Sequence, residues 1–314
     1  MESFTGKFAV VTGGGSGMGR ELVRQLATAG CSVAACDLNQ SSVTETGTLA
    51  RTDARPGVRV TSHTCDVADE AQVRRFCDEL LAEHARSDVD LVFANAGIGG
   101  GGSFVTGPRE EWERTFAIDW WGVYNCARVF LPLLIASGDG VLVNISSVNG
   151  FWATLGPGMP HTAYSAAKFA VKGFTEALIE DLRVNAPHVR VAVVMPGHVG
   201  TDIVANSLRV LGVGDPETMS DTDLEAIRNV LARRDPVAAG ATPGELRQIL
   251  TRMNSDFRDS APLNPADATK IILDGVLAGS WRILVGDDAK ALDAAVRARP
   301  DKAYDYPELF SAPA

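Results

Sequence analysis

The stretch "VVTGGGSGMGRELVRQLATAGC" at residues 10–31 decides the fold. It runs from an apolar segment through a glycine-rich turn into a segment with the periodicity of an amphipathic helix. Gly13, Gly17 and Gly19 let the backbone turn tightly and approach a pyrophosphate, and the helix start points free amides at that anion. A tight turn without a ligand also uses glycines, so the rest of the chain has to distinguish the two readings.

Short apolar runs alternate with helical segments along the whole chain. Because the runs are almost continuously apolar, they indicate strands buried on both faces, as in a parallel sheet. The alternation predicts right-handed crossovers and a doubly wound α/β sheet in a single domain. The expected strands are 7–12, 32–37, 58–63, 89–95, 140–146, 189–196 and 282–286. The expected helices are 17–29, 41–54, 69–85, 109–136, 163–186, 221–234, 243–253 and 265–279.

Two regions break this alternation. Residues 202–262 contain prolines, charges and short helical stretches but no strand pattern, and we interpret them as a helical lid over the substrate. Residues 287–314 follow the last expected strand. We expect this C-terminal extension to pack on the core or on a neighbouring subunit.

Composition narrows the possible partners. The chain has 314 residues, 46% hydrophobic and 22% charged, and its 29 basic and 39 acidic residues give a formal net charge of −10. Nucleic acid and anionic membrane surfaces need a basic footprint, so neither is an expected partner. Five cysteines without C-x-x-C spacing indicate buried thiols in a reducing compartment. The five histidines lack metal-ligand spacing, so we expect no metal site.

The first residues, "MESFTGKFAVVTGGG", lack the basic region and long apolar core of a secretory signal. No run of 18 apolar residues occurs in the chain, so no membrane-spanning helix is expected. The expected location is the cytoplasm.

A carboxylate ends the second expected strand, in "VAACDLN" at 33–39. Asp37 at this place can accept hydrogen bonds from both adenosine ribose hydroxyls of a dinucleotide, and its charge repels a 2′-phosphate. Leu38 and Asn39 follow, with no arginine to receive such a phosphate. The pattern therefore favours NAD over NADP. The alternative, an aspartate that only caps a helix, does not require this position.

A second carboxylate follows the third expected strand, in "TCDV" at 64–67. Asp66 can accept a hydrogen bond from the adenine amino group, with Val67 packing nearby. It can equally serve as the N-cap of the helix that begins near Asp69. The residues alone leave both readings open.

The fourth expected strand ends in "FANAGIGGGG" at 93–102. Asn95, Ala96 and Gly97 are small enough to let the backbone lie against a cofactor. The glycines from Gly99 to Gly102 predict a mobile loop at the carboxyl edge of the sheet, where ligands bind in this architecture.

A serine pair and a tyrosine–lysine pair supply the candidate chemistry. The fifth strand ends in "VNISSVNG" at 143–150, and the following helix carries Tyr164 and Lys168 in "AYSAAK" at 163–168. Four residues apart, the phenol and the ammonium share one helix face. A nearby ammonium lowers the pKa of a phenol, which ordinarily titrates near 10, and a serine hydroxyl can orient the substrate oxygen. We therefore expect Tyr164 and Lys168 to act together in transferring a proton.

In combination, these motifs resemble the short-chain dehydrogenase/reductase superfamily in its common short form. The resemblance covers about residues 5–201 and the last strand, and implies a seven-stranded parallel Rossmann sheet that transfers hydride between nicotinamide and a carbinol or carbonyl carbon. The motifs that carry it are "TGGGSGMG" (12–19), "NAG" (95–97), "ISS" (145–147), "YSAAK" (164–168) and "PGHVGT" (196–201).

The resemblance also implies roles for individual residues. Tyr164 would be the general acid/base, Ser147 the catalytic serine, and Lys168 would lower the pKa of Tyr164 and bind the nicotinamide ribose. Val199 and Thr201 would lie near the nicotinamide carboxamide. The expected cofactor-binding residues are Gly13, Gly15, Ser16, Gly17, Met18, Gly19, Asp37, Leu38, Asp66, Val67, Asn95, Ala96, Gly97, Tyr164, Lys168, Pro196, Gly197, Val199 and Thr201.

One residue departs from the family pattern. Members commonly carry an asparagine three residues before a glycine in the helix after "NAG", and here "AIDWWG" at 117–122 places Asp119 there. A carboxylate near Lys168 would pair with it and alter the titration of the tyrosine. Asp119 is therefore either a member of a proton relay or the residue at which a helix kinks.

The loop between Ser147 and Tyr164 is longer than in compact members of the family. Its apolar side chains either line a wide pocket or pack the loop onto the core. They are Phe151, Trp152, Leu155 and Met159. His161 and His198, close to the site in sequence, are interpreted as loop or cap residues rather than catalysts.

The function predicted from these residues is an NAD-dependent interconversion of a secondary alcohol and a ketone, on a bulky hydrophobic substrate. The alternative is a non-catalytic dinucleotide-binding sensor on the same fold, which would be expected to lack Tyr164 or Lys168. Two long helices, 109–136 and 163–186, carry apolar residues on more than one face, which together with the resemblance predicts a homodimer or homotetramer.

Overall fold

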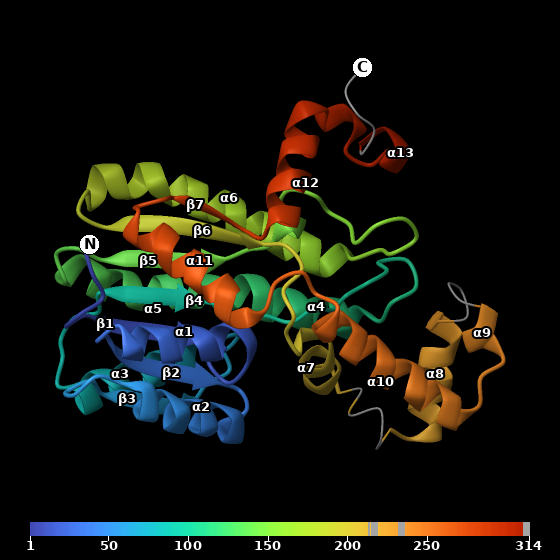
Figure 1. The fold of residues 1–314 in the computed structure, drawn as a ribbon, viewed down its shortest axis with the longest axis horizontal. Helices are drawn as coiled ribbons and strands as arrows, with labels where there is room; N and C mark the ends of the chain where they lie inside the picture. The colour runs from blue at the N-terminus through green and yellow to red at the C-terminus, as the bar shows by residue number, and fades with distance from the viewer. Residues whose placement is uncertain (213, 215–218, 232–235, 310–314) are drawn as a thin grey trace.

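The computed structural model describes residues 1–212, 214, 219–231 and 236–309 (Figure 1). Seven parallel strands form one sheet in the order β3-β2-β1-β4-β5-β6-β7, so the predicted doubly wound sheet is confirmed. The strand order reverses between β1 and β4, which is where ligands bind in open α/β sheets. The strands are β1 (Phe8–Thr12), β2 (Ser32–Asp37), β3 (Val60–Thr64), β4 (Leu91–Ala94), β5 (Val141–Ile145), β6 (Arg190–Pro196) and β7 (Arg282–Val285).

Helices cover both faces of the sheet because each central strand is apolar on both sides; every residue of β1 and of β5 is buried. On one face α1 (Gly17–Thr28), α2 (Gln40–Asp53) and α11 (Pro265–Leu277) pack against the strands. The opposite face is covered by a second set of helices. These are α3 (Glu70–His84), α5 (Gly122–Ala136) and α6 (Thr162–Asn185).

The single helix expected at 109–136 is wrong in one respect. The structure divides it into α4 (Arg109–Phe116), a π-helical turn (Ala117–Trp121) and α5. A π turn inserts one extra residue and rotates the helix that follows, and such turns are frequent at functional sites. Periodicity could not reveal it, because one inserted residue leaves the apolar pattern of each half intact.

The third strand begins at Val60 rather than at residue 58, because a turn at Gly57, where φ is +86°, delays its start. All seven expected strands, including this one, agree with the structure to within two residues at each end. The expected helix 221–234 has its residues 232–234 outside the described part of the chain.

In its described residues, the region interpreted as a lid at 202–262 contains four helices, and residues 213, 215–218 and 232–235 of this region lie outside the described part of the chain. They are α7 (Ile203–Val210), α8 (Asp221–Leu231), α9 (Pro236–Ala239) and α10 (Pro243–Asp259). A capping box starts α10, since Thr242 accepts from the Glu245 amide and Glu245 accepts from the Thr242 amide. In Figure 1 these helices project from the carboxyl edge of the sheet, and α8 and α10 share a small apolar cluster of their own.

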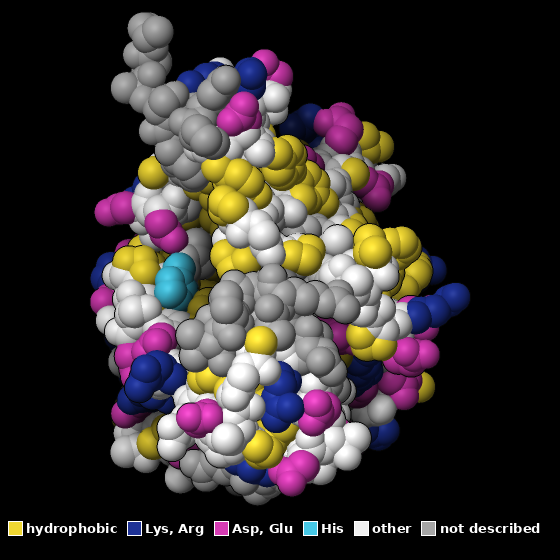
Figure 2. Space-filling view, turned by 90° about the vertical axis from the view of Figure 1, so that its right-hand side faces the viewer, with side chains coloured by type: hydrophobic (Ala, Val, Ile, Leu, Met, Phe, Trp, Pro, Cys, Tyr) yellow, Lys and Arg dark blue, Asp and Glu magenta, His cyan; other side chains and the backbone are white. Residues whose placement is uncertain are grey.

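The C-terminal extension forms α12 (Asp287–Ala298), a 3₁₀ turn (Pro300–Lys302) and α13 (Tyr306–Leu309), and it packs on the loop after β5. Between this segment and the lid, hydrophobic side chains gather on the face shown in Figure 2. Exposed apolar residues of two loops at this edge are Phe104, Val105, Leu155 and Met159.

Within the described ranges, no helix is long and apolar enough to cross a membrane. The same residues contain no group of three or more His, Cys, Asp or Glu side chains placed to hold a metal ion.

Candidate active site

The glycine turn between β1 and α1 has the close packing that its sequence predicts. Gly13 has φ of +67°, and a Cβ there would lie 2.7 Å from the Ala96 Cα. At Gly15 a Cβ would lie 2.9 Å from the Asp37 carboxylate. A side chain at either position would clash with neighbouring atoms of the protein, so the close packing of this turn requires glycine. A tight, glycine-rich turn between a strand and a helix start fits a pyrophosphate.

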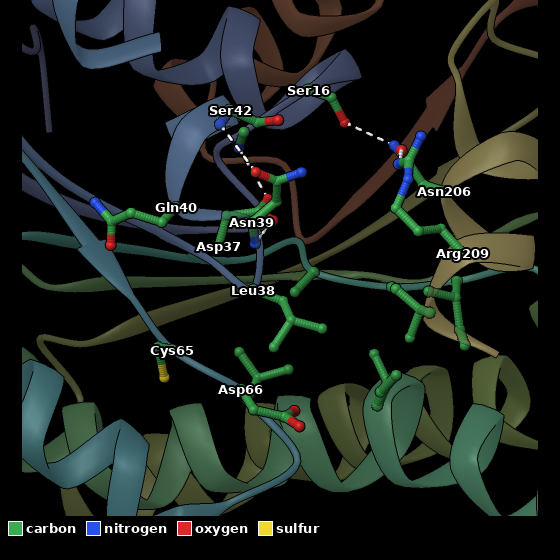
Figure 3. A pocket seen from close by; sticks show the side chains of 18 of the residues that line it. Ser16, Asp37, Leu38, Asn39, Gln40, Ser42, Cys65, Asp66, Asn206 and Arg209 are labelled. Atoms are coloured by element: carbon green, nitrogen blue, oxygen red, sulfur yellow. Dashed lines mark hydrogen bonds between the residues drawn. The ribbon is translucent and has the colours of Figure 1, made fainter. Parts of the chain in front are cut away.

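Asp37 is fixed at the end of β2 by two backbone amides. Its Oδ2 accepts from the Gly15 amide at 2.9 Å and its Oδ1 from the Asn39 amide at 2.9 Å. The carboxylate therefore joins the glycine turn to the start of α2 and lines the pocket drawn in Figure 3. This position suits an acceptor for ribose hydroxyls.

A cavity of about 580 Å³ lies at the carboxyl edge of the sheet, next to the point where the strand order reverses. Its size is typical of small-molecule sites, which span about 300–1,000 Å³. The expected residues that line it are Gly13, Gly15, Ser16, Asp37, Leu38, Asp66, Val67, Ala96 and Gly97. The lining residues that sequence reasoning missed are Asn39, Gln40, Ser41, Ser42, Cys65, Ile98, Arg114, Ile118, Asn206, Arg209 and Val210.

Some expected cofactor residues lie behind the lining. The Asn95 side chain donates to the carbonyls of Thr12 and Gly13, at 2.9 and 3.3 Å, so it braces the glycine turn. Met18 packs against the core. A Cβ on Gly17 would meet Thr201 at 3.0 Å, which places the end of the "PGHVGT" stretch under the start of α1. The other expected cofactor residues do not line the described cavity. They are Gly17, Met18, Gly19, Asn95, Tyr164, Lys168, Pro196, Gly197, Val199 and Thr201.

The N-cap alternative for Asp66 is wrong. Asp69 is the N-cap of α3, and its side chain accepts from the amides of Ala71 and Gln72. Asp66 instead accepts from the Ala68 amide at 3.0 Å and forms an ion pair with Arg114 at 2.8 Å. Both Asp66 and Arg114 line the cavity, so the carboxylate is available to a ligand but is already paired.

The serine, tyrosine and lysine of the candidate chemistry come together beside the end of β5. Lys168 Nζ lies 5.3 Å from the centre of the Tyr164 ring and donates to the Ile145 carbonyl at 3.1 Å. The Ser147 hydroxyl accepts from the Asn149 amide at 3.1 Å, and it acts on the Tyr164 phenol as a polar neighbour that lowers the pKa of the phenol. Ser146 is turned away, since its hydroxyl donates to the Lys168 carbonyl at 2.8 Å. Of the two serines, Ser147 is therefore the one that faces the phenol.

The titration of Tyr164 differs from the expectation. Burial raises the pKa of the Tyr164 phenol well above its ordinary value, the charge of Asp119 raises it further, and the Ser147 hydroxyl opposes both. Burial also lowers the pKa of the Lys168 ammonium, while Asp119 opposes that shift. In this structure the expected lowering of the tyrosine pKa is therefore wrong, because burial dominates and the charge acting on the phenol is negative.

Asp119 lies in the π-helical turn and is completely buried. Its Oδ1 accepts from the Ile98 amide at 2.9 Å and lies 3.9 Å from Lys168 Nζ, whereas its buried Oδ2 has no hydrogen-bond partner in the described structure. Burial raises the pKa of this carboxyl to about 6, against the opposing effect of Lys168. Asp119 therefore lies at the helix irregularity, as one of the two interpretations predicts. It also lies beside Lys168, and its membership of a proton relay stays a prediction.

The long loop after Ser147 packs mainly against the C-terminal extension. Trp152 Nε1 donates to the Ala303 carbonyl at 2.6 Å, and the Thr154 and Tyr306 hydroxyls lie 3.1 Å apart. Trp152 is thus a packing residue, whereas Leu155 and Met159 are 49% and 40% exposed.

The two histidines near the site differ in their surroundings. The His161 ring lies 4.6 Å from the Tyr164 ring, centre to centre, and burial lowers the pKa of the imidazole to about 4, so it is neutral at pH 7. The His198 amide donates to Asp288 at 2.7 Å, and its ring lies 2.7 Å from the Phe257 carbonyl oxygen. His198 therefore ties the end of β6 to neighbouring segments.

The doubly wound parallel sheet, the glycine turn at its switch point and the Ser147–Tyr164–Lys168 cluster define a Rossmann-fold oxidoreductase. The chain belongs to the short-chain dehydrogenase/reductase superfamily, because the family model described as "short chain dehydrogenase" matches residues 7–210.

Comparisons with known proteins agree with this assignment. The chain is 35% identical over 297 residues to a putative oxidoreductase, SadH, of Mycobacterium tuberculosis, covering 95% of this chain and 92% of that protein. A crystal structure of a short chain dehydrogenase/reductase from Burkholderia phymatum in complex with NAD superposes with a TM-score of 0.75 at 27% identity, covering 100% of this chain and 99% of the other. An alcohol dehydrogenase from the archaeon Thermococcus sibiricus, complexed with 5-hydroxy-NADP, gives a TM-score of 0.53 at 26% identity over 62% of this chain and 77% of that one.

Proposed function

We propose that this chain is an NAD(H)-dependent oxidoreductase that interconverts a secondary alcohol and a ketone. The observation that carries the proposal is the grouping of Ser147, Tyr164 and Lys168 at the carboxyl end of β5, with Lys168 Nζ 5.3 Å from the centre of the Tyr164 ring. This group lies close to the switch-point cavity, because a Cβ on Gly97, which lines the cavity, would lie 3.3 Å from Lys168 Nζ. A bound nicotinamide supplies the acceptor or donor of the hydride. The protein places the substrate oxygen between the two hydroxyls and moves the proton.

Ser147 and Tyr164 divide the work on the substrate oxygen. Ser147 donates a hydrogen bond that orients this oxygen and stabilises charge developing on it. During reduction Tyr164 gives its proton to the oxygen, and its raised pKa keeps the phenol protonated for this step at neutral pH. During oxidation Tyr164 must first lose its own proton and then take that of the alcohol. Burial and the charge of Asp119 oppose this loss. The Lys168 ammonium, 5.3 Å from the centre of the ring, acts in the opposite direction, since positive charge stabilises a phenolate.

Asp37 supports NAD as the preferred cofactor. Its carboxylate is held by two amides at the edge of the cavity, where it can accept from ribose hydroxyls and repel a 2′-phosphate. Both NAD and 5-hydroxy-NADP occur in the related solved structures. The preference is therefore a proposal about Asp37 in this chain, and a titration with both cofactors tests it.

A bulky hydrophobic substrate is proposed from the surface beside the site. Phe104 is 75% exposed on the loop before α4, and Leu155 and Met159 are exposed on the loop before α6. Figure 2 shows hydrophobic side chains gathered on this face. Exposed apolar side chains at a site entrance favour apolar ligands.

We further propose a homodimer or homotetramer formed through α5 and α6. Aromatic side chains of the helices and the π turn gather in one cluster, in which Trp120 lies 5.5 Å from Phe174 between ring centres. Trp121 and Phe169 are 47% and 40% exposed. Sedimentation velocity of the purified protein tests this proposal, and a monomer at micromolar concentration would contradict it.

The enzymatic proposal is tested with purified protein, NAD or NADH, and a panel of cyclic alcohols and ketones of graded size. Absorbance of the reduced nicotinamide reports turnover. Cofactor binding without turnover on any of these substrates would favour the alternative, a dinucleotide-binding sensor.

A further inference from the structure

One wall of the cavity comes from α7, the first helix of the lid. Asn206, Arg209 and Val210 line the cavity from this helix. Ser207, 2% exposed, accepts from the Gly99 amide at 2.7 Å, which fixes α7 to the loop after β4. Asn206 Nδ2 donates to the Ser16 hydroxyl at 3.0 Å, so α7 also touches the glycine turn. This wall was not predicted from the sequence.

Arg209 brings positive charge to this wall. Its Nη1 donates to Asn206 Oδ1 at 2.8 Å, and among the described residues Arg209 forms no ion pair with a carboxylate. The other arginine of the lining, Arg114, is neutralised by Asp66 at 2.8 Å. Figure 3 shows Asn206 and Arg209 extending from α7 toward Ser16. The guanidinium thus lies beside the glycine turn, away from any described partner of opposite charge.

The glycine turn itself offers no side-chain cation. Residues 13–19, "GGGSGMG", contain neither Lys nor Arg. The next residue, Arg20, points elsewhere: it donates to the Gly15 carbonyl at 2.8 Å and to Glu45 at 2.6 Å. Backbone amides at a helix start carry only partial charge, about half an elementary charge in total. A ligand with two phosphates therefore leaves most of its charge for another group to balance.

We propose that Arg209 binds the diphosphate of the dinucleotide, with Asn206 holding the guanidinium in place through its hydrogen bonds to Arg209 and Ser16. This inference rests on the proposed function, and it assigns a cofactor-binding role to the lid. A guanidinium forms charge-assisted hydrogen bonds to phosphate oxygens with two donors at once. The cavity then offers a hydrogen-bond acceptor, Asp37, to the ribose hydroxyls and a cation, Arg209, to the phosphates.

Binding measurements with Arg209→Gln test the proposal without turnover. The probes are NAD, ADP-ribose and adenosine, titrated by calorimetry or NMR against wild-type protein and the variant. Because one charge-assisted contact is lost, the affinities for NAD and for ADP-ribose are expected to fall by about 10- to 100-fold. Adenosine, which lacks phosphate, is expected to bind both proteins equally. Arg209→Lys is expected to recover part of the loss, and the salt dependence of NAD binding is expected to be shallower in Arg209→Gln.

Arg252→Gln is the matched control, because Arg252 is an exposed arginine of the lid, on α10, outside the cavity lining. It is expected to bind NAD as the wild type does. Equal NAD affinity of Arg209→Gln and wild type, or an equal loss for adenosine and ADP-ribose, would overturn the inference and leave the proposed function standing. A wild-type protein that binds neither NAD nor NADP would overturn both.

Discussion

Replacing Asp119 by asparagine tests the electrostatics of the site through protein stability. The carboxyl is fully buried, and its pKa is raised to about 6 from an ordinary value of 3.8. A raised pKa means that the folded state disfavours the charged carboxylate more than the unfolded state does. The free energy of unfolding therefore falls as the pH rises between these two pKa values. Asparagine has nearly the same shape and no charge, and its carbonyl oxygen can still accept from the Ile98 amide.

The size of the effect follows from the two pKa values. At pH 8 the buried charge lowers the free energy of unfolding by about 3 kcal/mol, and at pH 4.5 by about 1 kcal/mol. We therefore expect the stability of Asp119→Asn relative to wild type to increase by about 2 kcal/mol between pH 4.5 and pH 8. Urea unfolding followed by circular dichroism at several pH values measures this difference.

Asp293→Asn is the matched control with the opposite sign. Burial raises the pKa of Asp293, but hydrogen bonds from Arg282 and Arg297 outweigh burial, so its pKa is lowered overall. Its carboxylate therefore stabilises the fold above the unfolded pKa, and this contribution is lost as the pH falls through the folded pKa. Asp293→Asn should be less stable than wild type at pH 8, with a smaller deficit at low pH. A relative stability of Asp119→Asn that is the same at pH 4.5 and pH 8 would refute the reasoning on Asp119.

Two further predictions concern the cofactor and the loop. Asp37→Ala is expected to weaken NAD binding and to reduce discrimination against NADP, because the acceptor for ribose hydroxyls and the repulsion of a 2′-phosphate disappear together. Fluorescence titration with both cofactors measures the two affinities. An unchanged preference for NAD over NADP would show that Asp37 does not set the cofactor preference. Trp152→Phe is expected to lower the free energy of unfolding by about 1–3 kcal/mol, because the Ala303 carbonyl loses its donor. It should also raise KM for bulky substrates more than for small ones; urea unfolding and steady-state kinetics measure both effects, and equal KM changes would show that the C-terminal segment does not shape the substrate site.

The parts of the fold that sequence predicted share a local cause. The glycine turn, the apolar strands and the Tyr164–Lys168 spacing are set by residues within one or two turns of each other, so a pattern can reveal them. The seven strands and the approach of Ser147 to Tyr164 also follow, because the carboxyl ends of parallel strands meet at one edge.

The missed features depend on contacts between distant segments. Asn206 reaches the glycine turn across 190 residues of sequence and holds Arg209 by a hydrogen bond, and Trp152 meets Ala303 across 151 residues. The raised pKa of Tyr164 depends on its burial and on the buried charge of Asp119, and a spacing of four residues specifies neither. Such features become visible only when the chain is folded.

The most direct measurement of the central claim is hydride transfer by Tyr164→Phe, followed by the absorbance of reduced nicotinamide, alongside NAD affinity. Because only the phenolic oxygen is removed, we predict that NAD binding stays within about twofold while turnover falls by about 10²- to 10⁴-fold. Tyr124→Phe, a tyrosine of α5 outside the Ser147–Tyr164–Lys168 cluster, should keep full turnover. Turnover by Tyr164→Phe at the wild-type rate would contradict the account.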